Sequence, residues 1–281
     1  MIEDAHTAGF NIQKRTIHSW IAHGLLDKPS RRGAGRGSRP GLHSASQREL
    51  FLLLLSKREK TTKLSDLALI PLAIWLWSGD DWVPSRQAVK AFMTWFRNGG
   101  EQRKDLCRDS ALKALEQIDH PLASQTARNR FVRLFEEAAY RGRVDATERQ
   151  EFEKATRAVF EPPSVFHSTG MARAIGPHAM PITADTMLER IFSEIEGLTV
   201  IRDVGVSERL LRQARVHYCQ TKLEYAEIRP ALFGQSADST SEMFVERTVQ
   251  EEFNNVGRDL TIVIGALLMF PQAQEALDAL I

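Results

Sequence analysis

The feature that most constrains the fold is a short helical pattern followed directly by a long basic loop. Residues 12–23 repeat apolar side chains at helical spacing. The resulting face carries Ile12, Thr16, Ile17, Trp20 and Ile21. Gly24 then suits the end of the helix, because glycine readily adopts the left-handed conformation found there. The loop at residues 28–48 contains no Asp or Glu, and its cations are Lys28, Arg31, Arg32, Arg36, Arg39 and Arg48.

The one-sided charge of this loop favours contact with nucleic acid. Lys and Arg neutralise phosphates and release counterions, and the interspersed glycines let the backbone approach a partner closely. The polar side of the preceding helix carries side chains that can reach base edges in a major groove, namely Gln13, Lys14, Arg15, His18 and Ser19. The alternative is a solvated surface loop. Because the whole chain has a net charge of only +1, the positive charge is concentrated here, which favours the nucleic-acid interpretation.

The order of these residues resembles the DNA-binding domain of the MerR family. The run Arg-Thr-Ile-His-Ser-Trp at residues 15–20 is similar to the family's recognition helix, and Gly24-Leu25-Leu26 is similar to the step before its wing. The basic loop stands where the family has its wing, and the apolar residues 50–55 stand where its next helix packs. The resemblance covers about the first sixty residues. This stretch lacks the tyrosine that the family usually has in or just after the wing.

The resemblance implies an N-terminal winged helix-turn-helix with a short β-wing that binds double-stranded DNA. The helix at residues 12–23 would read the major groove, and the wing at residues 28–41 would contact phosphates or the minor groove. The implied DNA-binding residues are Lys14, Arg15, Thr16, His18, Ser19, Arg31, Arg32, Arg36 and Arg39.

The rest of the chain carries helical patterns, so we expect an all-α fold with short strands only in the wing. The expected parts are a DNA-binding domain at residues 1–60, a helical region at 61–160 and a helical C-terminal region at 184–281. Between the last two, the Pro/Gly-rich residues 161–183 are either a linker or an ordered loop. We also expect Pro71 to kink or break a helix, Pro84 to lie in a first helical turn and Thr147 to be an N-cap.

Composition and missing motifs argue against several classes of protein. The two cysteines, Cys107 and Cys219, are far apart and provide neither a disulfide framework nor a pair of metal ligands. No catalytic motif or phosphate-binding loop is recognisable, so we expect no enzymatic activity, no cofactor and no metal. The sequence starts without a signal-peptide pattern, and its longest apolar runs are shorter than the roughly twenty residues of a bilayer span. We therefore expect a cytoplasmic protein without membrane contact.

Two further segments each allow two interpretations. Residues 204–209 have the order of a second helix-turn-helix turn, but Ser207 equally suits a plain helix N-cap, which we favour. The aromatic residues between 75 and 96 line a ligand pocket or, as we favour, form part of a core.

The function expected from these features is that of a sequence-specific transcriptional regulator that binds DNA as a homodimer. Dimers of this kind place two recognition helices about one DNA turn apart. No heptad pattern persists after residue 60, so the long antiparallel coiled-coil helix of the MerR family is not expected. One alternative is a mobile-element excisionase or DNA-architectural accessory factor of the same fold. Another is a ligand- or protein-binding helical module with an incidental basic loop. The region after residue 60 would dimerise, sense an effector or hold a protein partner.

Overall fold

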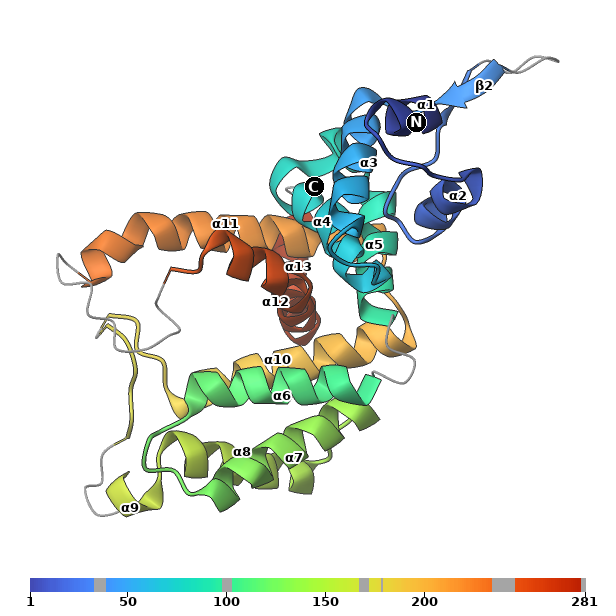
Figure 1. The fold of residues 1–281 in the computed structure, drawn as a ribbon. Coiled ribbons are helices and arrows are strands. Elements are labelled where there is room, and N and C mark those ends of the chain that lie inside the picture. Colours follow the sequence, from blue (N-terminus) through green and yellow to red (C-terminus); the bar gives the residue numbers. More distant parts are fainter. Residues whose placement is uncertain (33–38, 98–102, 167–171, 178, 234–245, 279–281) are drawn as a thin grey trace. The chain divides into compact units, whose positions relative to one another are not determined.

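The computed structural model describes residues 1–32, 39–97, 103–166, 172–177, 179–233 and 246–278 (Figure 1). In this part of the chain the fold is all-α apart from one pair of short strands and one isolated bridge, as the helical patterns predicted. The chain forms two compact units. The first comprises Met1–Asn98, Val206–Arg212 and Val249–Gly257, and the second comprises Gly99–Gly205, Gln213–Thr248 and Arg258–Ile281. The first unit thus extends well past residue 60, where the sequence suggested a boundary.

The first unit is built from short elements joined by tight turns. They are α1 (Ile2–Thr7), α2 (Lys14–Ala22), β1 (Ser30–Arg32), β2 (Arg39–Leu42), α3 (Ala45–Arg58), α4 (Leu64–Ser78), the 3-10 turn η1 (Gly79–Asp81) and α5 (Ser85–Arg97). Helix α4 packs against α3 and along α5, and α1 packs against α3. The core between these helices includes the fully buried side chains of Leu25, Phe51, Leu54, Leu72, Trp75 and Phe92.

Helix α4 continues through Pro71, so of the kink or break expected at this residue, the break is wrong. A proline inside a helix removes one backbone hydrogen bond and costs about 3 kcal/mol. Pro71 is itself buried, and most of α4 is buried around it, including Leu67, Leu72 and Trp75. Burial of this nearly continuous apolar surface offsets the local cost, at roughly 25 cal/mol per Å² of apolar area. Tertiary packing, not local propensity, decides the course of this segment.

Two helix starts differ from those expected. Pro84 immediately precedes α5, and its carbonyl accepts a hydrogen bond from the Gln87 backbone amide at 2.8 Å. Helix α8 is capped by Asp145 instead of Thr147: the Asp145 carboxylate accepts from the Glu148 amide at 2.8 Å, and the Glu148 side chain accepts from the Asp145 amide at 3.1 Å. This capping box satisfies two backbone donors at once, whereas Thr147 lies within the first turn.

The second unit is a set of packed helices. They are α6 (Arg103–Ile118), α7 (Gln125–Arg141), α8 (Ala146–Phe160), α9 (Pro163–Phe166), α10 (Ala184–Asp203), α11 (Glu208–Phe233), α12 (Val249–Met269) and α13 (Pro271–Asp278), of which α11 and α12 begin in the first unit. Helix α7 packs against α6, α8 and α10 (Figure 1). Arg202 of α10 donates to the carbonyls of Ala139 and Tyr140, at 3.0 and 2.6 Å, and so satisfies the C-terminal end of α7.

The described part of the Pro/Gly-rich residues 161–183 is an ordered loop within the second unit. Arg173 donates hydrogen bonds to the carbonyls of Ile118 and Phe160, at 3.1 and 2.9 Å, and so joins the ends of α6 and α8. Ile175 and Ile182 pair in an antiparallel bridge. Of the two interpretations of this stretch, the described residues support the ordered loop.

Candidate nucleic-acid interface

Helix α2 presents a polar edge to solvent and an apolar edge to the core. Lys14, Arg15 and His18 are exposed, while Ile17 and Trp20 are buried with only 8% and 2% of their surface accessible. The inward orientation expected for Ile17 and Trp20 is therefore confirmed. Ile21 is half-buried. The helix is shorter than the expected residues 12–23, since it begins at Lys14 and ends at Ala22.

The buried edge of α2 is fixed by an aromatic contact and a close backbone approach. The rings of Trp20 and Phe51 meet edge to face, with centroids 5.9 Å apart. Gly24 has a φ of +73°, and a Cβ atom at this position would lie 2.3 Å from the backbone nitrogen of Ala91 in α5. Only glycine combines this left-handed conformation with such a close contact. The glycine that ends α2 thus also allows α5 to pack against the turn.

A buried pair of glutamine side chains holds the turn that follows α2. Gln47 of α3 accepts a hydrogen bond from the Asp27 amide and donates to the Gln87 side chain of α5, both at 2.8 Å. The amide nitrogen of Gln87 in turn donates to the Leu25 carbonyl at 3.0 Å. Since the polar groups of a loop inside the protein need partners, these bonds stabilise one conformation of the turn. Helix α2 is therefore held by both α3 and α5.

The described part of the basic loop contains the strands β1 and β2. They pair antiparallel, with Ser30 opposite Leu42 and Arg32 opposite Arg39, and a bulge interrupts the register. The Ser30 hydroxyl donates to the Leu42 carbonyl at 3.0 Å. Arg36 lies outside the described residues. Only the backbone is described for Arg31, Arg32 and Arg39, so the expected contacts of these four side chains stay predictions.

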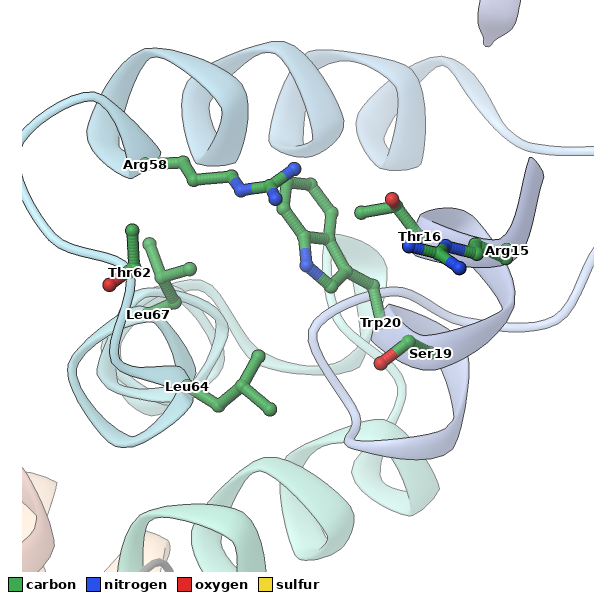
Figure 2. Close-up of a pocket in the computed structure, with 8 residues that line it drawn as sticks. All are labelled: Arg15, Thr16, Ser19, Trp20, Arg58, Thr62, Leu64 and Leu67. Atoms are coloured by element: carbon green, nitrogen blue, oxygen red, sulfur yellow. The ribbon is translucent and has the colours of Figure 1, made fainter. Parts of the chain in front are cut away.

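A cavity of about 390 Å³ opens beside the polar edge of α2 (Figure 2). Its lining comes from α2, from the end of α3, from the loop that follows α3 and from the start of α4, and consists of Arg15, Thr16, Ser19, Trp20, Arg58, Thr62, Leu64 and Leu67. In Figure 2 the Arg58 side chain extends from α3 toward Trp20, while Arg15 lies at the other side of the indole. Three of the residues implied by the resemblance, Arg15, Thr16 and Ser19, therefore share one cavity.

Arg58 lines the cavity but was not among the residues that the sequence indicated, because the basic stretch of the sequence ends at Arg48. The two arginines differ in their surroundings. Arg48 is engaged by Asp4, with its Nε 2.9 Å from the carboxylate, and together with the chain's amino group it lowers the pKa of Asp4 to about 2. Arg58 is exposed, and among the described residues it forms no ion pair. The run Lys57-Arg58 at the end of an apolar helix was the available signal.

The electrostatic character of this surface is one-sided within the described part of the chain. No carboxylate there forms an ion pair with Lys14, Arg15 or Arg58. Two other arginines of the first unit do have carboxylate partners: Arg86 binds Asp27, with its Nε at 3.0 Å, and Arg212 binds Asp80 at 2.9 Å. Unmatched cations on the exposed edge of α2 give a local positive potential on a chain of nearly zero net charge.

The other segments singled out in the sequence have structural roles. Ser207 caps α11 by accepting from the Leu210 amide at 3.1 Å, as in the simpler of the two interpretations. A second DNA-reading helix would need Arg212 to face the DNA. Instead, Arg212 also donates a hydrogen bond to the Ser85 hydroxyl at 2.7 Å. Among the aromatic residues between 75 and 96, Trp75 and Phe92 are fully buried in the core, whereas Trp77 is half exposed.

No protein-family model, curated protein or solved structure matches this chain. Among the described helices none is long and apolar enough to cross a membrane by itself. Helices α12 and α13, which are bent by 103° relative to each other, are together long and apolar enough for a membrane span, by length and composition only.

Proposed function

We propose that the protein binds double-stranded DNA sequence-specifically, as a winged helix-turn-helix of the MerR type, and regulates transcription. Helix α2 would enter the major groove, and residues 28–41 would contact phosphates or the minor groove. The observation that carries the proposal is the exposed, unmatched positive edge of α2, on which Lys14, Arg15 and His18 stand. Arg and Lys on an exposed helix edge have the chemistry needed to contact guanine bases and phosphates.

The rigid seating of α2 supports the same proposal. Reading bases requires that side chains be held in a fixed register against the duplex, and α2 is held at its C-terminal end by α3 and α5. Arg58 adds a second cation to the cavity that Arg15 lines, and there it can contact the DNA backbone. We further propose that two copies of the chain bind one operator, because paired half-sites one turn apart give such proteins their affinity.

The test of the proposal is selection of binding sites from random duplex DNA, followed by mobility shifts at several salt concentrations. Recovery of one sequence motif shared by the selected duplexes would support the proposal. Absence of DNA affinity at low salt would instead favour a ligand- or protein-binding module. Among DNA-binding roles, a promoter palindrome would indicate a regulator, and several direct repeats near an attachment site would indicate an accessory factor for recombination.

Replacing Arg15 with alanine is expected to weaken specific binding by about 1–3 kcal/mol and to relax the preference at one base position. The expectation follows from its exposed place on the polar edge of α2. The measurement compares wild type and variant on the selected site and on its single-base substitutions. Arg133→Ala, which removes an exposed arginine from α7, is the matched control and should bind as wild type. A uniform loss on all sequences would assign Arg15 to a phosphate instead of a base.

Replacing Arg31 and Arg32 with alanine is expected to weaken binding to all sequences by similar factors. Each lost phosphate contact also lowers the slope of log affinity against log salt concentration by roughly one. Titrations of one duplex between low and moderate salt measure that slope. An unchanged slope would mean that the arginines of β1 do not contact DNA phosphates.

A further inference from the structure

The C-terminal end of α2 and the turn after it lie against one side of α5. Gln87, Ala91 and Thr94 are spaced by four and three residues, so they stand on the same side of α5. The Thr94 hydroxyl donates a hydrogen bond to the His23 carbonyl at 2.8 Å. The Gln87 side chain donates to the Leu25 carbonyl at 3.0 Å. Helix α5 therefore binds the backbone of this turn at two points.

The two bonds act where α2 cannot supply partners of its own. His23 is the C-cap of α2, and the last carbonyls of a helix have no amide of that helix to accept from. Thr94 and Gln87 are buried, with 9% and 1% of their surface accessible, so losing either donor would leave a carbonyl shielded from water and without a partner. The end of α2 thus depends on α5 for the pairing of its carbonyls and for its direction.

The segment fixed in this way leads directly to side chains that are expected to face DNA. The Nδ1 atom of the His23 ring lies 2.8 Å from the Ser19 carbonyl. Ser19 follows Arg15 by one turn on the polar edge of α2, and both residues line the same cavity (Figure 2). A binding site functions well only while its side chains stay within about 0.5 Å of the productive position. A change in the direction of this short helix therefore alters the register of Arg15 and Ser19 against a duplex.

Two kinds of DNA binding respond differently to such a change. Nonspecific binding rests on phosphate contacts, which Lys and Arg can make at many positions along the backbone. Specific binding also needs hydrogen bonds to base edges, and these bonds are lost when a side chain is out of register. A purely structural role of the two α5 bonds would lower the stability of the first unit and leave the ratio of specific to nonspecific affinity unchanged.

We propose that Thr94 and Gln87 are positioning residues for base recognition: they fix the end of α2 so that its polar edge meets the bases in one register. The role in base recognition rests on the proposed function, whereas the fixing of α2 by α5 does not. Both residues lie beyond the first sixty residues, which are the part of the chain that resembles a DNA-binding domain. Specificity would thus depend on a helix outside that part.

Hydrogen exchange of the full chain without DNA tests the fixing of α2. The amides of Gly24 and Leu25 donate back into α2, to the carbonyls of Ile21 and Trp20 at 3.3 and 2.8 Å, so their exchange reports the opening of this end. Thr94→Val removes only the hydroxyl donor. We expect exchange at both amides to be roughly threefold to tenfold faster, the factor for one lost hydrogen bond. Equal exchange in Thr94→Val and wild type would overturn the proposal.

Three further variants separate positioning from a general loss of stability. Thr94→Ser restores the hydroxyl and should exchange like wild type. Gln87→Met removes the bond to Leu25 at similar volume and should exchange faster, which gives a second reading of the same effect. Thr156→Val is the matched control, because Thr156 is a fully buried threonine of the second unit whose hydroxyl donates to the Phe152 carbonyl at 2.9 Å. It should leave exchange at the end of α2 unchanged.

Mobility shifts on the selected duplex and on an unrelated duplex test the role in base recognition. In the double variant Gln87→Met/Thr94→Val we expect the ratio of the two affinities to fall at least about fivefold, the lower end of what one bidentate base contact contributes. Binding to the unrelated duplex should stay within about twofold of wild type, since phosphate contacts tolerate small shifts of the helix. Thr94→Ser and Thr156→Val should keep the wild-type ratio. An unchanged ratio in the double variant would overturn the role in base recognition.

The two experiments also distinguish failure of this proposal from failure of the proposed function. A wild-type chain without any preference among duplexes would contradict the proposed function, and the role of both residues in base recognition with it. Faster exchange in Thr94→Val would in that case still establish that α5 fixes the end of α2. A specific wild-type chain whose double variant keeps its preference would leave the proposed function standing and contradict this proposal alone.

Discussion

Replacing Trp20 with alanine is expected to lower the free energy of unfolding of the first unit by about 3–5 kcal/mol, the range observed for a large aromatic side chain removed from a core. Trp20 is only 2% exposed, and its ring packs edge to face against the fully buried Phe51. Its loss leaves a cavity between α2 and α3 that rigid helices cannot close. It also removes the aromatic contact through which α2 packs against α3.

Urea denaturation of the full chain, followed by far-UV circular dichroism, measures the effect of Trp20→Ala. Trp77→Ala is the matched control, because Trp77 is 50% exposed on α4, and its replacement should change the stability much less. An unchanged denaturation curve for Trp20→Ala, combined with loss of DNA binding, would mean that Trp20 contacts the DNA and that α2 is rotated relative to the structure.

The sequence correctly predicted several local features of the first unit. The helical spacing of Ile17 and Trp20 identified the buried edge of α2, and Gly24 identified its end. The short strands also fall in the region where strands were expected, from Ser30 to Leu42. These features are local: side-chain periodicity and glycine conformation depend on neighbours a few residues away.

The features that the sequence analysis missed depend on residues far apart in the chain. Arg58 lines the same cavity as Arg15 only because α3 returns past α2. The hydrogen bond between Gln47 and Gln87 has no local signature, since a glutamine on a helix is usually solvated. A break at Pro71 was wrongly expected for the same reason: the local cost of the proline is visible in the sequence, but the burial that offsets it is not.

The fragment of residues 1–60, where the sequence placed the DNA-binding domain, is expected to remain largely unfolded. It lacks α4 and α5, which cover the core side of α2 and α3. Without α5, the Leu25 carbonyl loses its bond from Gln87, the Gln47 amide nitrogen loses its acceptor on Gln87, and Gly24 loses its contact with Ala91. Unpaired polar groups of this kind cost about 1–3 kcal/mol each if they stay buried.

The apolar faces left open in this fragment make its folding still less favourable. Leu50, Phe51 and Leu54 of α3 are at most 2% exposed in the whole first unit, and α4 packs against this helix. A sixty-residue chain is marginal even when its core is complete.

The measurement is far-UV circular dichroism with thermal melting of residues 1–60, beside the full chain and a fragment of residues 1–98. We expect cooperative melting of the full chain and no cooperative transition in the shorter fragment. The fragment of residues 1–98 restores α4 and α5 and should recover helix content, but it should melt below the full chain. It lacks Gly257, which lies against Trp95, and Arg212, which binds Asp80. Cooperative melting of residues 1–60 would mean that α2 and α3 form a domain without α5, and that the contacts at Gly24 and Gln87 are dispensable.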